Sequence, residues 1–138
     1  MHFDLVDRVV EISAERIVTL KQVSRAEEYL QDHFPEFPVL PGVFMVESLV
    51  QAARRLVEQN GGPARLVLGG VRALKYGSFV RPGESLRVEV NLHKTNADGT
   101  FEFKGEGTVL RGVGGDGTEM GEAPTAVSGR FVLRPVRV

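Results

Sequence analysis

One stretch constrains the fold more than any other, a proline-rich segment that runs directly into an apolar helix. Residues 33–51 read HFPEFPVLPGVFMVESLVQ. Pro35, Pro38 and Pro41 each fix the backbone φ angle and remove a hydrogen-bond donor, so the segment before Gly42 must be a stiff loop. The rest of the chain therefore has to be arranged around a helix whose entry direction is set by a rigid loop.

The helix is predicted to run from about Val43 to Asn60, where Gly61, Gly62 and Pro63 form a strong stop signal. At about 100° per residue its apolar side chains form one stripe, and further apolar residues surround its first half. We expect a helix that is buried where it begins and exposed where it ends, as for a helix wrapped by a curved sheet. The stripe comprises Val43, Val46, Leu49, Val50, Ala53, Leu56 and Val57.

The segments on either side of the helix have the β-branched residues and the alternation of apolar and polar residues that are typical of antiparallel strands. Gly105 and Gly107 share one face of a predicted strand with Phe101 and Phe103, where a sheet must bend or another backbone must come close. The sequence predicts an α+β fold, with one long central helix wrapped by a curved antiparallel sheet, in a single domain over residues 1–138. The predicted strands are 6–12, 16–23, 65–74, 76–80, 86–92, a strand from 101, and 126–134.

Composition excludes several classes of function. With a formal net charge of −1 in 138 residues, the chain has no overall electrostatic attraction for nucleic acid or an anionic membrane. It has no cysteine, which excludes disulfides, thiolate nucleophiles and cysteine-ligated zinc. No apolar run approaches the ~18 residues of a membrane helix, and the first residues lack the pattern of a secretion signal. A cytoplasmic protein is expected.

Glu47 is the residue of the helix that most needs an explanation. A carboxylate among apolar neighbours costs folding free energy unless it is paired or hydrogen-bonded, so a plain surface charge fits poorly. His33, taken alone, could be structural or solvated, but a histidine and a partly buried carboxylate together can divide the roles of general acid and base. The N–H of Gly42 is a candidate for polarising a carbonyl oxygen, although a glycine there could also serve only to permit the turn.

These residues resemble the signature of the FabZ-type 3-hydroxyacyl-acyl-carrier-protein dehydratases, which have the hotdog fold. Similar segments also occur at residues 5–9, 20–23 and 79–84, so the resemblance covers the chain up to about Gly107. Glu47 separates the chain from the related dehydratase/isomerases, which typically carry aspartate at this place. The residues that carry the signature are His33, Phe34, Pro35, Pro38, Val39, Leu40, Pro41, Gly42, Val43, Glu47 and Gln51.

The resemblance implies a homodimer at least, with a trimer of dimers as a further assembly, and active sites at the subunit interface. His33 of one subunit would take the proton at C2 of a 3-hydroxyacyl thioester, and Glu47 of the other would protonate the departing hydroxyl. The N–H of Gly42, beside Val43, would bind the thioester carbonyl, and Gln51 would orient the Glu47 carboxyl group. The product would be a trans-2-enoyl thioester, and the reaction would need no cofactor and no metal.

The acyl chain is expected to occupy an apolar tunnel, and an acidic acyl carrier protein would need a basic rim. Coenzyme A is the alternative carrier, and no nucleic-acid or membrane partner is expected. Each tunnel residue is equally well explained as core, and each basic residue as simply solvated. The tunnel residues are Phe37, Leu40, Phe44, Met45 and Phe79, and the basic residues are Arg72, Lys75 and Arg81, with Arg54 and Arg55 as additions.

Two other functions remain open, a hotdog acyl thioesterase that releases free acid and thiol, and a non-catalytic hotdog subunit that binds acyl chains.

The family usually has glycine immediately before the histidine, whereas this chain has Asp32. If Asp32 faces the imidazole, it raises the pKa of His33 and weakens it as a base; if it faces solvent, the effect is small.

Overall fold

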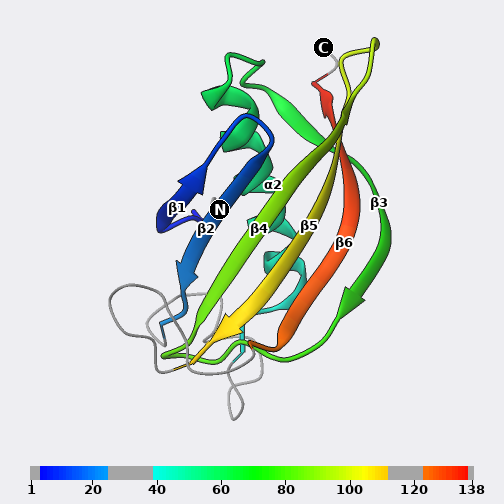
Figure 1. Ribbon diagram of the computed structural model, residues 1–138. Helices are drawn as coiled ribbons and strands as arrows, with labels where there is room; N and C mark the ends of the chain where they lie inside the picture. The colour runs from blue at the N-terminus through cyan, green and yellow to red at the C-terminus, as the bar shows by residue number, and fades with distance from the viewer. Residues whose placement is uncertain (1–3, 25–38, 112–122, 137–138) are drawn as a thin grey trace.

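A six-stranded antiparallel sheet and one long helix make up the parts of the chain that the computed structural model describes, residues 4–24, 39–111 and 123–136 (Figure 1). The strands lie in the order β1-β2-β4-β5-β6-β3, so β1 and β3 are the two edges. The elements are β1 (Arg8–Ile12), β2 (Arg16–Gln22), α2 (Gly42–Gln59), β3 (Leu66–Tyr76), β4 (Ser85–Thr95), β5 (Phe101–Leu110) and β6 (Thr125–Pro135).

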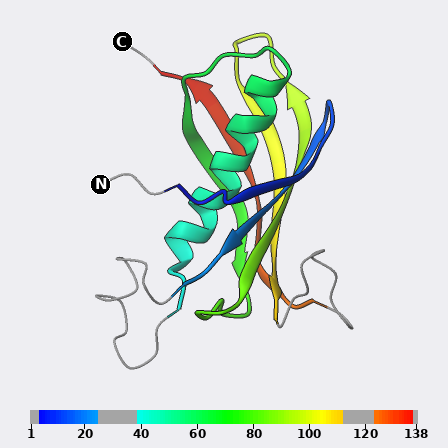
Figure 2. The same ribbon diagram turned by 90° about the vertical axis from the view of Figure 1, so that its left-hand side faces the viewer.

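Helix α2 lies along one face of the sheet, and the view of Figure 1 looks onto the other face, called here the outer face. Figure 2, turned by 90°, shows the helix beside the curved strands. The predicted α+β architecture is confirmed, and the predicted helix agrees with α2 to within one residue at each end. Neighbouring strands all pair antiparallel, as the alternating pattern predicts.

The core lies between α2 and the inner face of the sheet. Leu49, Ala53 and Leu56 of α2 are fully buried, and they share one apolar cluster with side chains from β2, β4, β5 and β6. The prediction that the helix is buried where it begins was wrong for Val43, which is 70% exposed. The sheet covers one side of α2 (Figure 2), and the exposure of Val43 shows that the sheet does not cover this residue. The sheet residues of the cluster include Ile17, Leu86, Val88, Val90, Phe103, Val127, Phe131 and Leu133.

Strand β3 is longer and less regular than predicted. It continues as a single strand to Tyr76, and the separate strand predicted over 76–80 is wrong. Its register with β6 shifts between Leu68 and Gly70 and again between Arg72 and Lys75. After the strand ends, the backbone of Gly77 comes so close to Thr125 that a Cβ would lie 2.3 Å from the Thr125 carbonyl oxygen. Only glycine allows this close approach of two backbones.

The glycines of β5 make room for side chains, as the sequence indicates. A Cβ on Gly105 would lie 3.2 Å from both Cδ atoms of Leu49, so this glycine lets α2 sit close to the sheet. Gly107 relieves crowding of a different kind, because a Cβ there would lie 2.9 Å from Leu86 and Val127 on the neighbouring strands. Both glycines therefore serve packing of the core.

We predict that Gly105→Ala lowers the free energy of unfolding by about 1–3 kcal/mol, because the added methyl overpacks the contact with Leu49. Gly70→Ala is the matched control. A Cβ on Gly70 meets nothing within 4 Å, so its effect should stay within about 0.5 kcal/mol. Urea denaturation measures both variants, and equal effects would contradict this account of Gly105.

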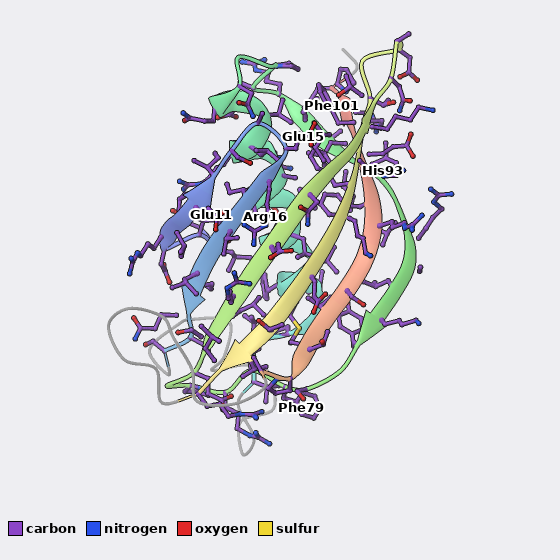
Figure 3. All side chains as sticks on the ribbon, viewed as in Figure 1. Glu11, Glu15, Arg16, Phe79, His93 and Phe101 are labelled. Carbon is purple, nitrogen blue, oxygen red and sulfur yellow. The ribbon has the colours of Figure 1, made fainter. Side chains whose placement is uncertain are left out.

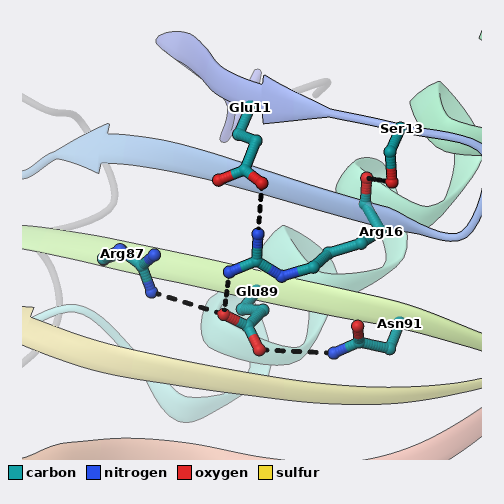
Figure 4. Close-up of polar contacts among 6 residues, drawn as sticks. All are labelled: Glu11, Ser13, Arg16, Arg87, Glu89 and Asn91. Atoms are coloured by element: carbon teal, nitrogen blue, oxygen red, sulfur yellow. Dashed lines mark hydrogen bonds and ion pairs between the residues drawn. The ribbon is translucent and has the colours of Figure 1, made fainter.

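The outer face of β1, β2 and β4 carries a balanced network of charges (Figure 4). Arg16 donates to Glu11 at 2.5 Å and to Glu89 at 2.6 Å, and Arg87 lies 3.7 Å from the same Glu89 carboxylate. The hydrogen bond from Arg16, helped by one from Asn91, holds the pKa of Glu89 below its ordinary value, against the opposing effect of partial burial. The charged side chains of this network are thus paired with opposite charges.

We predict that Glu89→Gln is less stable than the wild-type protein at pH 7, and that the difference closes as the pH falls. A lowered folded-state pKa contributes stability above the unfolded pKa of about 4.3, and that stability is lost as the pH falls through the folded pKa. Denaturation at pH 7 and near pH 3 measures this, with Glu58→Gln at the exposed end of α2 as control. A difference that persists undiminished near pH 3 would rule out an electrostatic origin.

Candidate active site

Helix α2 is preceded by a proline, whose side chain has no hydrogen-bonding group with which to cap the helix. Pro41 occupies the N-cap position, makes no side-chain hydrogen bond to the helix, and is followed by no acidic residue in the first turn. The first N–H groups of a helix have no acceptor within the helix, and they carry the positive end of its dipole. The amides of Gly42 and Val43 are therefore placed to bind an oxygen atom that bears negative charge.

Gly42 is required by a contact with another strand rather than by the turn. It is absent from the residues with positive φ, so the backbone conformation alone does not demand glycine. A Cβ at this position would lie 2.9 Å from ring carbons of Tyr76 and 3.2 Å from its hydroxyl oxygen. The phenol ring of Tyr76 therefore covers the first turn of α2, and glycine is the residue that leaves space for it.

A largely apolar cavity of about 280 Å³ lies beside this helix terminus. The backbone N–H of Leu40 donates to the carbonyl of Val80 at 2.8 Å, which ties the entry of the helix to the segment after β3. Three of the predicted tunnel residues, Leu40, Met45 and Phe79, line the cavity, while Phe44 packs against the core instead. The remaining lining residues are Val39, Pro41, Gly42, Tyr76, Gly77, Ser78 and Ala126.

Glu47 is half-exposed in the single chain and lies among polar partners. Its Oε1 is 3.5 Å from Nη1 of Arg54 and 3.4 Å from Nε2 of Gln51, and 40% of its side chain is exposed. Arg54 is itself anchored, because its Nε donates to the carbonyl of Leu66 at 2.9 Å. Glu47 thus has the polar partners that a carboxylate at this place needs, and its predicted burial against a second subunit stays a prediction.

Gln51 connects the helix to the start of the chain. Its Oε1 accepts a hydrogen bond of 2.8 Å from the backbone N–H of Leu5. This bond fixes which end of the amide faces which way, so the NH₂ group is the end turned toward Glu47. Gln51 therefore lies between Leu5 and Glu47, and its role in orienting the Glu47 carboxyl group stays a prediction.

The other predicted site residues fall into two groups. His33 and Phe37 lie outside the described residues, so the pairing of His33 with Glu47 stays a prediction. The basic residues do not gather at the cavity that Gly42 lines. Arg72 faces Glu102 at 3.8 Å, Lys75 is exposed near the end of β3, and Arg81 follows in the next turn. The predicted basic rim also stays a prediction.

Sequence reasoning missed Tyr76 as a residue of this site, and it assigned Arg54 to the basic rim rather than to a contact with Glu47. Tyr76 is remote from Gly42 in sequence, and only the path of β3 brings the two together. Arg54 follows Glu47 by seven residues, about two helical turns, and this spacing puts both residues on the same side of the helix. Within the described ranges no cluster of three or more histidine, aspartate or glutamate side chains could hold a metal. In those same parts of the chain, no helix combines the length and apolar character needed to cross a membrane.

A family model described as ApeI-like dehydratase matches residues 9–113 of the chain. This match runs from the second residue of β1 to the end of β5 and includes the whole of α2. The chain belongs to the ApeI-like dehydratase family. The prediction of a FabZ-type hotdog dehydratase is confirmed by the relatives that follow.

The relatives of this chain include two 3-hydroxyacyl-(acyl-carrier-protein) dehydratases named FabZ. The one from Polynucleobacter asymbioticus is 38% identical over 110 residues, 78% of this chain and 73% of the relative. That from Ruminiclostridium cellulolyticum is 40% identical over 94 residues, 65% of this chain and 66% of the relative. The chain thus matches about two thirds of the length of such relatives.

Solved structures confirm the hotdog fold of this dehydratase-family chain. The dehydratase heterocomplex ApeI:P from Xenorhabdus doucetiae aligns with a TM-score of 0.66 at 15% identity. The alignment covers 96% of this chain and 99% of that chain. At such low identity the likeness concerns the fold, which the helix along a curved sheet already displays in Figure 2.

We predict that Gly42→Ala destabilises the wild-type protein but not a Tyr76→Ala variant. Alanine favours helix over glycine by about 1 kcal/mol, so the substitution costs stability only where the phenol ring occupies the space. A double-mutant cycle by urea denaturation should give a coupling of about 1 kcal/mol or more. Additive effects of the two substitutions would show that the ring does not press on Gly42.

Proposed function

We propose that the protein dehydrates 3-hydroxyacyl thioesters to trans-2-enoyl thioesters in fatty-acid or related acyl-chain biosynthesis. The observation that carries the proposal is the helix terminus of α2, where uncapped N–H groups adjoin an apolar cavity and a carboxylate follows one turn later. This combination suits a thioester carbonyl with an apolar chain attached to it. Membership of a dehydratase family supports the same reaction.

In the proposed reaction, His33 removes the proton from C2 of the substrate as general base. Negative charge develops on the thioester carbonyl oxygen as the C2–H bond breaks, and the N–H of Gly42 stabilises it. Glu47 donates a proton to the hydroxyl group on C3, which leaves as water while the C2–C3 double bond forms. Gln51, held by Leu5, keeps the Glu47 carboxyl group in position.

We propose that each site is completed by a second copy of the chain, so that His33 and Glu47 come from different subunits. The exposed side of β3 and of the helix start supports this. β3 is an edge strand of 11 residues, and an unpaired edge of this length is a surface on which another strand can pair. Large apolar side chains on and beside it are exposed, including Leu68, Val71, Leu74, Tyr76, Phe79 and Val43.

The carrier of the acyl group is proposed to be acyl carrier protein, with coenzyme A as the alternative. Relatives named for acyl-carrier-protein substrates support the first carrier. Lys75 and Arg81 flank Phe79 in sequence and are the basic residues nearest along the chain to the cavity, so they are the stronger candidates for contacts with an acidic carrier. The proposed cellular location is the cytoplasm.

We predict that Glu47→Gln lowers turnover of a 3-hydroxyacyl thioester by about 100-fold or more, because the amide cannot supply the proton. His33→Ala should have an effect of similar size. Glu58→Gln, at the exposed end of the same helix, is the matched control and should keep wild-type rates.

Ultraviolet absorbance of the 2-enoyl thioester measures the reaction, and gel filtration confirms that the variants keep their assembly. Wild-type turnover in Glu47→Gln would refute the assigned role. Release of free thiol without enoyl product would establish a thioesterase instead. Saturable binding of acyl thioesters with neither product would establish a non-catalytic subunit.

A further inference from the structure

Three cations lie directly opposite one another on the outer face of the sheet. Arg72 of β3 pairs with Arg130 of β6, and Arg130 pairs with Lys104 of β5. Residues directly opposite in antiparallel strands have Cβ atoms only about 5 Å apart, and like charges at such positions destabilise a sheet. These three residues, called here the cation row, therefore form an arrangement that folding alone does not favour.

In the described parts of the chain, two of the three residues in the cation row lack the carboxylate partners that Arg16 has on the same face. Arg72 lies 3.8 Å from Glu102. Within the described residues, no ion pair shorter than 4 Å involves Lys104 or Arg130, and both are exposed. The contrast is with Arg16, which two carboxylates satisfy on the same face. Two positive charges of the row thus remain available to a ligand.

The cation row borders a hollow of about 230 Å³. A β-bulge lies on each side of it, one in β3 next to Gly70 and one in β4 that leaves His93 without a cross-strand partner. Gly70 adds no side chain to the hollow, and His93, labelled in Figure 3, lies along its border. Bulges of this kind commonly re-aim side chains beside binding sites.

We propose that this hollow binds a phosphate group. Guanidinium groups present planar pairs of N–H donors that match phosphate oxygens, and the Lys104 ammonium adds a third cation. A concave site of this volume suits a small group better than the flat surface of an acidic protein. Glu102 also lines the hollow, and its carboxylate stays beside Arg72, so Arg130 and Lys104 are the principal ligands. This site is separate from the proposed dehydratase site and does not depend on it.

The phosphate could be free or carried by a nucleotide, and titration calorimetry on the full chain at low ionic strength separates the two. The probes are inorganic phosphate, adenosine 5′-phosphate and adenosine 3′,5′-bisphosphate. Equal affinities would identify free phosphate, whereas tighter binding of a nucleotide would show that Val132, an apolar residue that lines the hollow, contacts the rest of the ligand. Either result supports the site.

Arg130→Gln should weaken phosphate binding by about tenfold, the effect of losing one charged hydrogen bond. Arg8→Gln is the matched control, an exposed arginine of the opposite edge strand β1 with the same loss of charge. It should change the affinity by less than about twofold, because distant surface charges are screened. An equal loss in both variants would show that only net charge matters, and would overturn the proposal.

The stability of the protein against urea, measured with and without phosphate, is a second test of the same site. Without phosphate, Lys104→Gln should raise the urea midpoint of unfolding, because it removes one of the opposed like charges. Phosphate should then raise the midpoint of the wild-type protein more than that of the variant. No saturable binding below about 10 mM, a concentration that corresponds to very weak affinity, would overturn the proposal. So would Arg130-dependent binding of an acidic carrier protein without any binding of the phosphate probes.

Discussion

The close approach of α2 to the sheet is the constraint on which the rest of the structure depends. Leu49 can pack against β5 only because Gly105 has no side chain at the point of contact. This contact fixes the middle of the helix, and with it the positions of Glu47 two residues earlier and of Gly42 at the first turn. A helix held a few ångströms further out would lose the contacts that define both residues.

Two further contacts set the chemical environment at the start of α2. The ring of Tyr76 lies against Gly42, so the helix terminus forms one wall of an apolar cavity rather than opening freely to solvent. The hydrogen bond from Leu5 holds Gln51, which in turn faces Glu47. Backbone donors and an apolar cavity therefore lie at the start of α2, and a carboxylate follows in the second turn of the same helix. In the proposed reaction, these groups serve the removal of water next to a thioester.

Much of the fold could be predicted from the sequence because it depends on local patterns. The 3.6-residue period of α2 and the two-residue alternation of β4 each record which face of an element is buried. The position of Gly42 at the start of the helix could be predicted in the same way. The reason why glycine is needed there could not, because Tyr76 contacts Gly42 only as a result of the path that β3 takes. The pairing of His33 with Glu47 came from resemblance alone, because it depends on a second copy of the chain.

The cation row shows a similar limit. Arg72, Lys104 and Arg130 are far apart in sequence, and strand register alone makes them neighbours. That register depends on the bulges of β3, which no short sequence motif predicts. The charge composition did not indicate this site either, because a net charge of −1 for the whole chain does not show where positive charges are concentrated. Register and bulges are tertiary properties, so sites that depend on them become visible only in the folded chain.

The central claim is that one active site combines His33 of one chain with Glu47 of another, and mixed dimers test it most directly. His33→Ala and Glu47→Gln are each inactive by this account, but a dimer with one chain of each kind contains one intact site. Unfolding the two variants together and refolding them should restore about a quarter of the wild-type activity, because half of the dimers are mixed and each has one working site of two. A mixture that forms mixed dimers by native mass spectrometry yet stays inactive would contradict the claim.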